Sequence, residues 1–545
     1  MSRVSKAVQR LVGGSVQLTN GQRAVSTSAR AENSLSIDLD IGVKQCPFRA
    51  TMESFTLDRE ESGSLSIPEA NESTVQPFDA VPGPKGLPFL GTLLDYFKKD
   101  GLRFSKMFEA YRARSLEYGP VYKERFGPVE MVVISDPAEY SKVMRAEGKF
   151  PVRREMEPMA YDRTQKGMDM GLVNSQGEEW HRQRTAVSKH MLPLQTVAQF
   201  CQPMDTVAEE FTQKLPLAMD SQGEVKGLEQ EIFKWAMESI GTFLFEERIG
   251  CMETKPSQQA QDFIHHLRSY FKLMQPLMYN LPIYKLFPTQ KWRQYQFHSD
   301  RVIKIGQSFV DKKVDALKKG EVGNTSAFLS GLLSNDNLSS RDVTGIAVDL
   351  LMAAVETTST ATTWCLYNLA KNPEAQSRLA AEVKAAVPQG GEITTESLAQ
   401  MPYLKAVLKE TFRVYPITYA TSRILPSDIE VAGYNIPAGS HVQANLFGMF
   451  RDPELFPDPE SFKPSRWLRE AKMDPKLKSL SNLVWGHGAR MCIGRRIAEQ
   501  ELHILLAKVV QKFELSYHHE DVEAILNTVI TPDRPVQIKF TPRNL

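Results

Sequence analysis

One short stretch decides how the rest of the chain is interpreted: Trp485-Gly-His-Gly488-Ala-Arg490-Met-Cys492-Ile-Gly494. Its glycines let the backbone approach a flat partner closely, and helical periodicity follows from Arg495 to about Phe513. A cysteine at a helix N-terminus has a lowered thiol pKa, which favours a thiolate ligand. Arg490 adds a cation two residues before Cys492, and a cation there suits a carboxylate of a bound group.

This stretch resembles the haem-binding signature of the cytochrome P-450 family, F-x-x-G-x-R-x-C-x-G, with Trp485 where phenylalanine is usual. The resemblance implies that Cys492 is the axial ligand of the iron in haem b, and that Trp485, Gly488 and Arg490 also bind the cofactor. It further implies a mainly α-helical fold with small β-sheets, in which haem lies between a long oxygen-side helix and the cysteine loop. The alternative is a buried, unreactive cysteine beside a glycine turn.

Further motifs of this family follow in order, which predicts one monooxygenase domain over residues 81–545. Glu410-Thr-Phe-Arg413 matches the E-x-x-R helix, and the i, i+3 spacing places both charges on one face. Arg466 matches the arginine that joins this pair. The resemblance implies a buried structural lock of Glu410, Arg413 and Arg466, whereas the E-x-x-R pair taken alone is more often a solvated surface contact.

Three more residues match family positions that hold the haem propionates. Trp180 and Arg184 fit the pattern W-x-x-x-R, and their i, i+4 spacing lets the indole N–H and the guanidinium point the same way. Arg423 lies ten residues beyond Arg413, where the family places another such arginine. For Arg423 alone, a surface charge is the alternative.

The longest predicted helix starts at Ser339, with Asp342 in the capping-box position, and ends at Asn372-Pro373. Short β-like stretches cover Val129–Ser135 and Ile429–Val442. The chain has no repeat of 20–50 residues, and no GxGxxG follows a predicted strand. The sequence therefore signals no nicotinamide or flavin site, so electrons must come from a partner.

Within the long helix, Ala353-Ala-Val-Glu-Thr-Thr358 resembles the family's oxygen-activation motif, with Ala354 in place of the usual glycine. The resemblance implies that Thr357 hydrogen-bonds the bound oxygen and that Glu356 supplies protons, beside a helix irregularity that orders water. The alternative is that the hydroxyls of this Thr-rich run bond back to helix carbonyls.

Composition narrows the class of protein. The 545 residues are 42% hydrophobic and 24% charged with a net charge of +1, which gives no electrostatic case for nucleic acid. No apolar stretch approaches the ~20 residues that cross a bilayer as a helix. The cysteines lack any C-x-x-C pair, which argues against a disulfide framework and a structural zinc site. They are Cys46, Cys201, Cys251, Cys365 and Cys492.

The N-terminal residues differ in composition from the rest. Residues 1–31 are basic and Ser-rich without a single acid, which predicts a mitochondrial transit peptide; a disordered basic tail is the alternative. Residues 32–80 are acidic and poor in aromatics, which predicts a mobile linker. The Pro/Gly run that follows Val81 marks entry into the compact domain.

Four basic residues resemble positions at which mitochondrial members receive a small acidic ferredoxin: Lys405, Lys409, Arg495 and Arg496. The resemblance implies an adrenodoxin-like partner with its NADPH-dependent reductase, and a location on the matrix side of the inner membrane. Complementary charge would steer the ferredoxin to the cysteine side of the haem. Solvated lysines on an exposed helix face are the alternative.

The substrate is only weakly encoded. Segments Met156–Met170 and Ile417–Ser422 resemble substrate-contacting positions and suit a bulky lipophilic molecule. By analogy with animal mitochondrial hydroxylases, that molecule is steroid- or sterol-derived. The apolar segment Tyr270–Phe287, interrupted by two prolines, resembles the family's loop for peripheral membrane contact; core packing is the alternative.

The main hypothesis is therefore a monooxygenase that inserts one atom of O2 into a C–H bond. A microsomal drug-metabolising relative is disfavoured by the missing anchor. A haem-thiolate sensor or carrier without turnover would not need the Glu356-Thr357 pair, because ligand binding requires no proton relay. A structural mitochondrial protein with vestigial motifs is the remaining alternative.

Overall fold

The computed structural model describes residues 75–97, 101–127, 129–320, 328–388 and 391–543. The expected transit peptide at 1–31 and most of the expected linker at 32–80 lie outside the described residues. The folded unit begins at Val75, earlier than the expected boundary at residue 81. The Gln76 N–H donates to the Gly433 carbonyl at 2.8 Å, and the Asn435 N–H donates to the Gln76 carbonyl at 2.9 Å. These backbone bonds make the last residues of the expected linker part of the fold.

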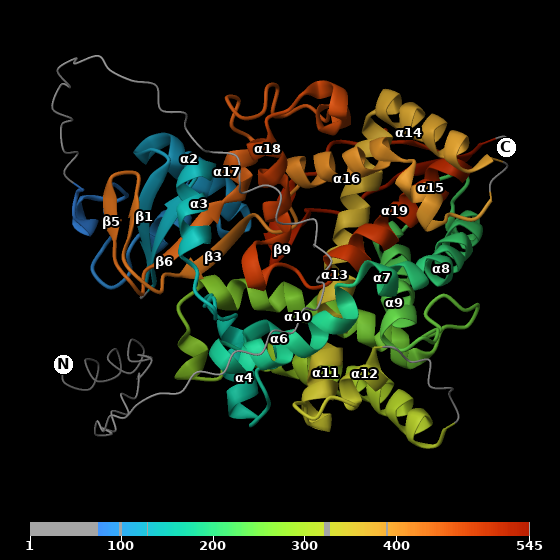
Figure 1. Cartoon of the computed structure of the whole chain (residues 1–545), viewed down its shortest axis with the longest axis horizontal. Helices are drawn as coiled ribbons and strands as arrows, with labels where there is room; N and C mark the ends of the chain where they lie inside the picture. Colours follow the sequence, from blue (N-terminus) through green and yellow to red (C-terminus); the bar gives the residue numbers. More distant parts are fainter. Residues whose placement is uncertain (1–74, 98–100, 128, 321–327, 389–390, 544–545) are drawn as a thin grey trace, which may run out of the picture. The chain divides into compact units, whose positions relative to one another are not determined.

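Helices make up most of the folded unit, which confirms the expectation of a mainly α-helical fold with small sheets (Figure 1). The α-helices are α2 (Met107–Tyr118), α3 (Pro137–Ala146), α4 (Glu157–Gln165), α5 (Gly171–Asn174), α6 (Gly177–Met191), α7 (Leu194–Gln199), α8 (Cys201–Lys214), α9 (Leu228–Leu244), α10 (Gln258–Tyr279), α11 (Gln290–Lys318), α12 (Leu329–Leu333), α13 (Ser340–Lys371), α14 (Pro373–Ala386), α15 (Thr395–Ala399), α16 (Pro402–Val414), α17 (Leu446–Phe450), α18 (Pro475–Leu480) and α19 (Arg495–Lys512).

Within the described residues, the strands form one four-stranded sheet and three two-stranded sheets. They are β1 (Val121–Phe126), β2 (Val129–Ile134), β3 (Ala420–Ile424), β4 (Ile429–Val431), β5 (Tyr434–Ile436), β6 (His441–Asn445), β7 (Phe513–Ser516), β8 (Ala524–Asn527), β9 (Val529–Pro532) and β10 (Lys539–Pro542). The larger sheet has the order β1-β2-β6-β3, in which β2 and β6 are parallel and the other neighbours are antiparallel. The small sheets pair β4 with β5, β7 with β10 and β8 with β9.

The two predicted strands differ in outcome. The stretch Val129–Ser135 forms β2 almost as expected. The stretch Ile429–Val442 is broken into β4, β5 and the start of β6. Ala432 and Gly433, both with positive φ, turn the chain between β4 and β5, and such a turn is most easily made with a glycine.

The long helix α13 organises the core. Its predicted start is confirmed, because the Ser339 hydroxyl accepts from the Asp342 N–H at 3.1 Å while the Asp342 carboxylate accepts from the Ser339 N–H at 2.8 Å. It ends at Lys371, before Asn372-Pro373, as predicted. Most of its side chains are buried all round, because α9, α11, α16 and α19 pack on it (Figure 1).

Candidate active site

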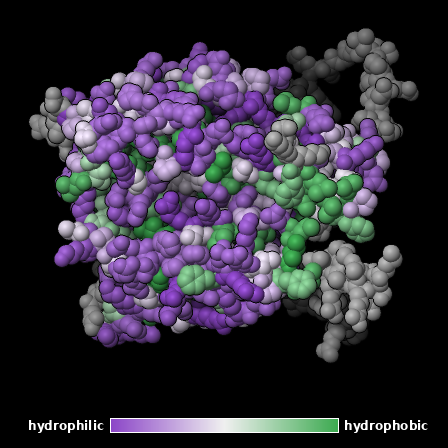
Figure 2. All heavy atoms as spheres, turned by 180° about the vertical axis from the view of Figure 1, so that it is seen from behind, coloured by the Kyte–Doolittle hydropathy of each residue, from purple (hydrophilic) through white to green (hydrophobic). Residues whose placement is uncertain are grey.

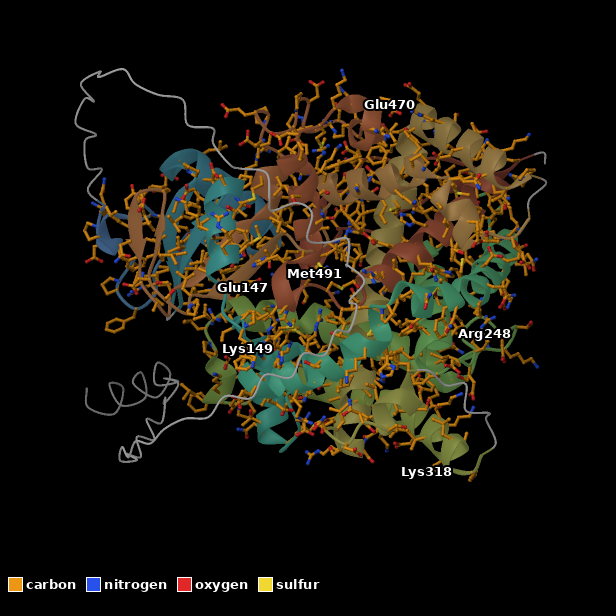
Figure 3. The ribbon with its side chains drawn as sticks, in the orientation of Figure 1. Glu147, Lys149, Arg248, Lys318, Glu470 and Met491 are labelled. Atoms are coloured by element: carbon orange, nitrogen blue, oxygen red, sulfur yellow. The ribbon has the colours of Figure 1, made fainter. Side chains whose placement is uncertain are left out.

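The cysteine loop joins the 3₁₀ turns Ser481–Trp485 and Gly488–Arg490 to the start of α19. Gly486 and Gly488 have φ values of 78° and 58°, which a residue with a side chain rarely adopts. The Cys492 N–H donates to the Trp485 carbonyl at 2.7 Å, which closes the loop. Figure 3 labels Met491, the neighbour of Cys492, in the interior of the ribbon.

The Cys492 side chain opens into a cavity of ≈ 420 Å³ between the cysteine loop, α13, α6 and β3, called here the thiol cavity. Six of the seven residues that the sequence assigns to the cofactor line this cavity, and Gly488 is the exception. Thr357 lines the cavity as well. These residues are Trp180, Arg184, Thr357, Arg423, Trp485, Arg490 and Cys492. The remaining wall is largely apolar, with side chains from Leu172, Leu350, Ala353, Ala361, Phe412, Ile417 and Val484.

Four guanidiniums converge on this cavity: Arg153, Arg184, Arg423 and Arg490. Burial and repulsion from the other three lower the pKa of Arg490 to about 9. Arg490 Nη1 is buried without a hydrogen-bond partner among the described residues. The same two causes, burial first and then Arg423 and Arg184, lower the pKa of Arg153 to about 10. A group with two negative charges in the cavity would relieve this repulsion.

Each of the predicted arginines is held in place by backbone oxygens. Arg184 donates to the Met491 carbonyl at 2.7 Å, and Arg490 donates to the Pro151 carbonyl at 2.9 Å. The Arg490 guanidinium also lies 3.9 Å from the centre of the Trp180 ring. Arg423 is 3% exposed, which excludes the alternative of a surface charge.

Gly488 acts through a neighbour that the sequence did not indicate. A Cβ on Gly488 would collide with the carboxylate of Glu147. That carboxylate accepts from Arg423 Nε at 2.6 Å and lies 3.2 Å from His487 Nε2. The glycine therefore makes room for the carboxylate that positions Arg423, and Figure 3 labels Glu147 near the cysteine loop.

The thiol itself departs from the expectation of a lowered pKa. Burial raises the pKa of Cys492, and this effect outweighs the opposing N–H of Gly494 and the cations of Arg184 and Arg495. The opposing groups favour the thiolate, so they would stabilise it once a metal ion binds the sulfur.

Glu356 and Thr357 face two different cavities. Thr357 opens into the thiol cavity, where its hydroxyl donates to the Ala353 carbonyl at 2.7 Å. Glu356 instead lines a second cavity of ≈ 570 Å³, called here the polar cavity. Successive helical side chains point about 100° apart, so the two residues lie on different faces of α13.

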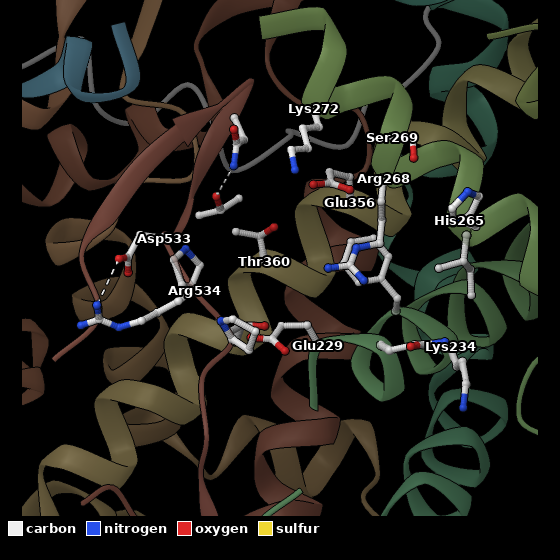
Figure 4. Close-up of a pocket in the computed structure, with 18 of the residues that line it drawn as sticks. Glu229, Lys234, His265, Arg268, Ser269, Lys272, Glu356, Thr360, Asp533 and Arg534 are labelled. Atoms are coloured by element: carbon white, nitrogen blue, oxygen red, sulfur yellow. Dashed lines mark hydrogen bonds and ion pairs between the residues drawn. The ribbon is translucent and has the colours of Figure 1, made fainter. Parts of the chain in front are cut away.

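The polar cavity lies between α9, α10, α13 and the end of β9 (Figure 4). Its lining mixes cations and carboxylates, among them Glu229, Lys234, Arg268, Lys272, Glu356 and Arg534. Burial raises the pKa of Glu356 to about 7, and the charge of Arg268 opposes this shift. Glu356 Oε2 has no hydrogen-bond partner among the described residues, which leaves it free to bind water.

The expected irregularity in α13 is not found. The helix is regular from Ser340 to Lys371, and Ala354 favours this geometry because alanine stabilises helices by about 1 kcal/mol over glycine. Several hydroxyls of the Thr-rich run bond back to helix carbonyls, as the alternative interpretation proposed: those of Thr357, Ser359, Thr362 and Thr363. Thr358 instead donates to the buried carboxyl of Glu501 on α19 at 2.9 Å.

The structure brings Glu410, Arg413 and Arg466 together. Arg413 donates two hydrogen bonds of 2.9 Å to the Glu410 carboxylate, and Arg466 Nε donates a third at 3.0 Å. The Trp467 indole N–H and the Lys463 backbone N–H, both at 2.8 Å, complete the set. Five donors thus surround one fully buried carboxylate, called here the Glu410 lock.

The four predicted docking residues do not all lie together. Lys405 and Lys409 are exposed on α16, and Lys409 is close enough to Lys478 and Arg495 for their charges to lower its pKa, after burial, the largest cause. These four residues, Lys405, Lys409, Lys478 and Arg495, are called here the basic cluster. Arg496 is turned away and donates to the Leu192 carbonyl, because consecutive residues of α19 point to different faces.

Sequence reasoning missed Arg153, Glu147, Glu501 and Lys478. Each acts through a contact with a distant segment, as when Glu147 meets Arg423. In Pro151-Val-Arg153-Arg and in Glu147, no motif marks the residue as different from an ordinary surface charge.

Comparison with known proteins identifies the class that this geometry belongs to. A sequence profile described as Cytochrome P450 matches residues 81–540. The chain therefore belongs to the cytochrome P450 family, and it is a haem-thiolate monooxygenase.

Individual relatives show which members of the family the chain resembles. The chain is 56% identical over 531 residues to "Cytochrome P450 10" of Lymnaea stagnalis, which covers 96% of each chain. It is 33% identical over 441 residues to "Sterol 26-hydroxylase, mitochondrial" of Mus musculus, which covers 78% of this chain and 83% of that one. It is 30% identical over 466 residues to "1,25-dihydroxyvitamin D(3) 24-hydroxylase, mitochondrial" of Rattus norvegicus, over 85% and 89% of the two chains.

The residues of the thiol cavity fit haem b. Cys492 offers the sulfur, the apolar wall suits a flat macrocycle, and the four converging guanidiniums suit two propionates. The unpartnered Arg490 Nη1 is a donor suited to a propionate oxygen.

Proposed function

We propose that this protein hydroxylates a lipophilic, steroid- or sterol-derived molecule with O2, using electrons from a mitochondrial ferredoxin and its NADPH-dependent reductase. The observation that carries the ferredoxin partner is the basic cluster beside the cysteine loop. Lys405 and Lys409 are exposed, and three cations surround Lys409 against one carboxylate, Glu499, which is paired with Arg495. The cluster therefore keeps a net positive charge that suits an acidic protein.

Bound haem supplies the activation of O2. In the proposed mechanism, Cys492 would ligate the iron, and Trp180, Arg184, Arg423 and Arg490 would hold the propionates. The apolar wall excludes water from the substrate side of the thiol cavity. The Trp485 ring packs edge-on against Phe412 at 5.4 Å and would cover the sulfur side of a bound haem.

Protons reach the site through α13 in this proposal. Glu356 takes a proton from water in the polar cavity, and its pKa of about 7 lets it bind and release that proton near neutral pH. The Thr357 hydroxyl, which opens into the thiol cavity and now donates to the Ala353 carbonyl, would hold a proton on the substrate side of that cavity. Arg268 keeps the pKa of Glu356 from rising further.

The substrate class rests on the names of the relatives and on the cavity wall. Two relatives are named as hydroxylases of a sterol and of 1,25-dihydroxyvitamin D(3). The thiol cavity offers mainly apolar side chains with the hydroxyls of Thr418, Thr421 and Ser422. A steroid nucleus with few polar groups matches that lining.

Peripheral membrane contact is supported by an apolar edge of exposed side chains: Leu87, Phe89, Leu281, Ile283, Leu286 and Phe287. The edge has two parts, residues 87–89 and residues 281–287, which meet at the end of β1. Leu281 lies against Gly127 there, and Gly91, just after residues 87–89, pairs with Phe126. Figure 2 shows apolar side chains gathered at one edge of the visible face. Among the described residues, no helix is long and apolar enough to cross a membrane.

Placement on the matrix side of the inner membrane follows from the same proposal. Residues 1–31 would act as the transit peptide and residues from 32 as a linker to the monooxygenase domain. Import of the full chain into isolated mitochondria, with removal of an N-terminal segment, tests this assignment. Unprocessed chain outside the organelle would contradict it.

The ferredoxin proposal is tested by neutralising Lys405 and Lys409 together to Gln. Close interfacial charge pairs couple by ~1.5–7 kcal/mol, so apparent ferredoxin affinity should fall at least about tenfold while the carbon monoxide spectrum is unchanged. Wild-type reduction should also slow as salt rises, since the Debye length shrinks from ~10 Å at ~0.1 M.

A matched control is Lys312→Gln with Lys318→Gln, two exposed lysines on α11. This control should keep wild-type affinity and salt dependence. The ferredoxin proposal would be overturned if the two double variants had the same apparent ferredoxin affinity. It would also be overturned if only a microsomal flavoprotein reduced the wild type. Substrate class is tested separately by screening steroids, sterols and fatty acids for the low-to-high-spin shift of the haem.

A further inference from the structure

Three of the ten histidines meet on the outer helices, away from the cysteine loop. His265 and His266 lie on α10, and His298 lies on α11. The two helices form an antiparallel hairpin. Successive contacts along it pair Gln259 with Ser308, and Tyr270 with Tyr295.

The three imidazoles form a compact group. His266 Nδ1 lies 2.9 Å from His298 Nδ1, so one of these nitrogens must carry the hydrogen that the other accepts. The ring centres are 5.1 Å apart for His266 and His298, and 6.0 Å apart for His265 and His298. One ring nitrogen from each histidine lies within 4.8 Å of the other two.

This geometry points to a metal site: we infer that His265, His266 and His298 bind one divalent transition-metal ion of the zinc class. Zn–N bonds of about 2.0–2.1 Å in a tetrahedron place ligand nitrogens roughly 3.3–3.4 Å apart. The 2.9 Å between His266 Nδ1 and His298 Nδ1 is shorter than this value, and one nitrogen of each ring lies within 4.8 Å of the others, so rotation of these exposed or half-buried side chains is sufficient to close the site. Imidazole suits zinc, copper and nickel, whereas oxygen donors suit calcium and magnesium.

Three protein ligands leave a fourth position for water or for a carboxylate. Asp262 lies one turn before His266 on α10, and its charge acts on that histidine. Arg301 on α11 faces the same histidine with the opposite sign. The cluster therefore offers three neutral donors with one acid at hand, which is the ligand count of open zinc sites.

The position gives such an ion a structural effect. The ion would join α10 to α11, the hairpin that packs on α13 and whose connecting loop carries part of the apolar edge. His265 also lines the polar cavity, as Figure 4 shows on the same helix as Arg268. Bound metal would therefore stiffen the helices that cover the Glu356 side of α13. Because the ligands lie outside the thiol cavity, this site is independent of the substrate and of the electron donor.

The test uses the haem-loaded full chain without a histidine tag, dialysed against zinc alone. Metal analysis should find one zinc per haem, and thermal unfolding should shift upward with zinc because only the folded hairpin assembles the site. His266→Gln and His298→Gln should each weaken zinc binding by at least about 100-fold, since even outer partners of a metal ligand contribute about 10–100-fold.

The matched control is His518→Gln, an exposed histidine whose ring contacts Ser516 rather than the cluster. It should bind zinc as the wild type does. All variants should keep the wild-type carbon monoxide spectrum, which shows that they fold and hold haem. Zinc bound equally by wild type and both cluster variants, or no zinc bound by the wild type, would overturn the site. In the second case the cluster is only a group of packed rings.

Discussion

The thiol cavity and the polar cavity meet α13 at successive residues, Thr357 and Glu356. The thiol cavity has an apolar wall with arginines at one side, whereas the polar cavity is lined by charges of both signs. A single step along a helix is enough to separate a largely apolar cavity from a charged one, because neighbouring side chains point about 100° apart. Under the proposed function, oxygen chemistry and proton supply would thus share one turn of α13.

The largest difference between the two cavities is expected when the sulfur ligand is removed from the thiol cavity alone. Cys492→His should abolish hydroxylation and the red-shifted carbon monoxide band, because imidazole does not donate electrons as thiolate does. The polar cavity should be unaffected. The carbon monoxide difference spectrum of the purified variant measures this, and an unchanged band would contradict the ligand assignment.

The next change tests the polar side alone. Glu356→Gln should lower turnover by about 100-fold, since a positioned general acid contributes roughly 10²–10⁴-fold. Substrate affinity and the carbon monoxide spectrum should be unchanged, because Glu356 does not line the thiol cavity. Turnover and the substrate spin shift are measured on the same sample. A loss of substrate affinity equal to the loss of turnover would place Glu356 in binding instead.

A smaller effect on turnover is expected from changing Thr357, the neighbour of Glu356 that opens into the thiol cavity. Thr357→Ala should keep substrate binding but divert electrons to hydrogen peroxide, and product per electron should fall about tenfold. Thr362→Ala is the control, because that hydroxyl bonds to the Thr358 carbonyl and lines neither cavity. Full coupling in Thr357→Ala would transfer the role to another hydroxyl, of which Thr358 is the nearest.

The smallest expected effect is a shift in the pH dependence of turnover, which reports on the polar cavity alone. Glu356 donates only when protonated, so turnover should decline as pH rises through its pKa of about 7. Arg268 lowers that pKa, so Arg268→Gln should raise it and move the alkaline limb upward by up to about one pH unit. A pH profile of turnover measures the limb. A shift to lower pH would exclude Glu356 as the titrating group.

Local chemistry explains what the sequence predicted well. The start of α13 follows from the capping box of Ser339 and Asp342, and its end from Asn372-Pro373. The pairing of Glu410 with Arg413 follows from their i, i+3 spacing, and the cysteine loop follows from its glycines. Each of these features is determined by residues within a few positions of one another.

The predictions that failed or were missing depend on contacts between residues far apart in the chain. Helical periodicity separates Glu356 from Thr357 by an angle, but which cavity each one meets depends on α10 and β9, far along the chain. The pairing of Arg423 with Glu147 joins residues 276 positions apart. The expected irregularity in α13 was wrong because the family's glycine is replaced by Ala354, a residue that favours regular helix.

The Glu410 lock also has a consequence for the order in which the chain matures. Glu410 is synthesised before Lys463, Arg466 and Trp467, yet these three residues supply three of its five donors. A buried carboxylate with part of its donors missing is strongly unfavourable, so the lock closes as a unit only after Trp467 has left the ribosome. The cysteine loop emerges later still. Truncated or slowly translated chains should therefore remain open and vulnerable to proteases until almost their whole length has been made.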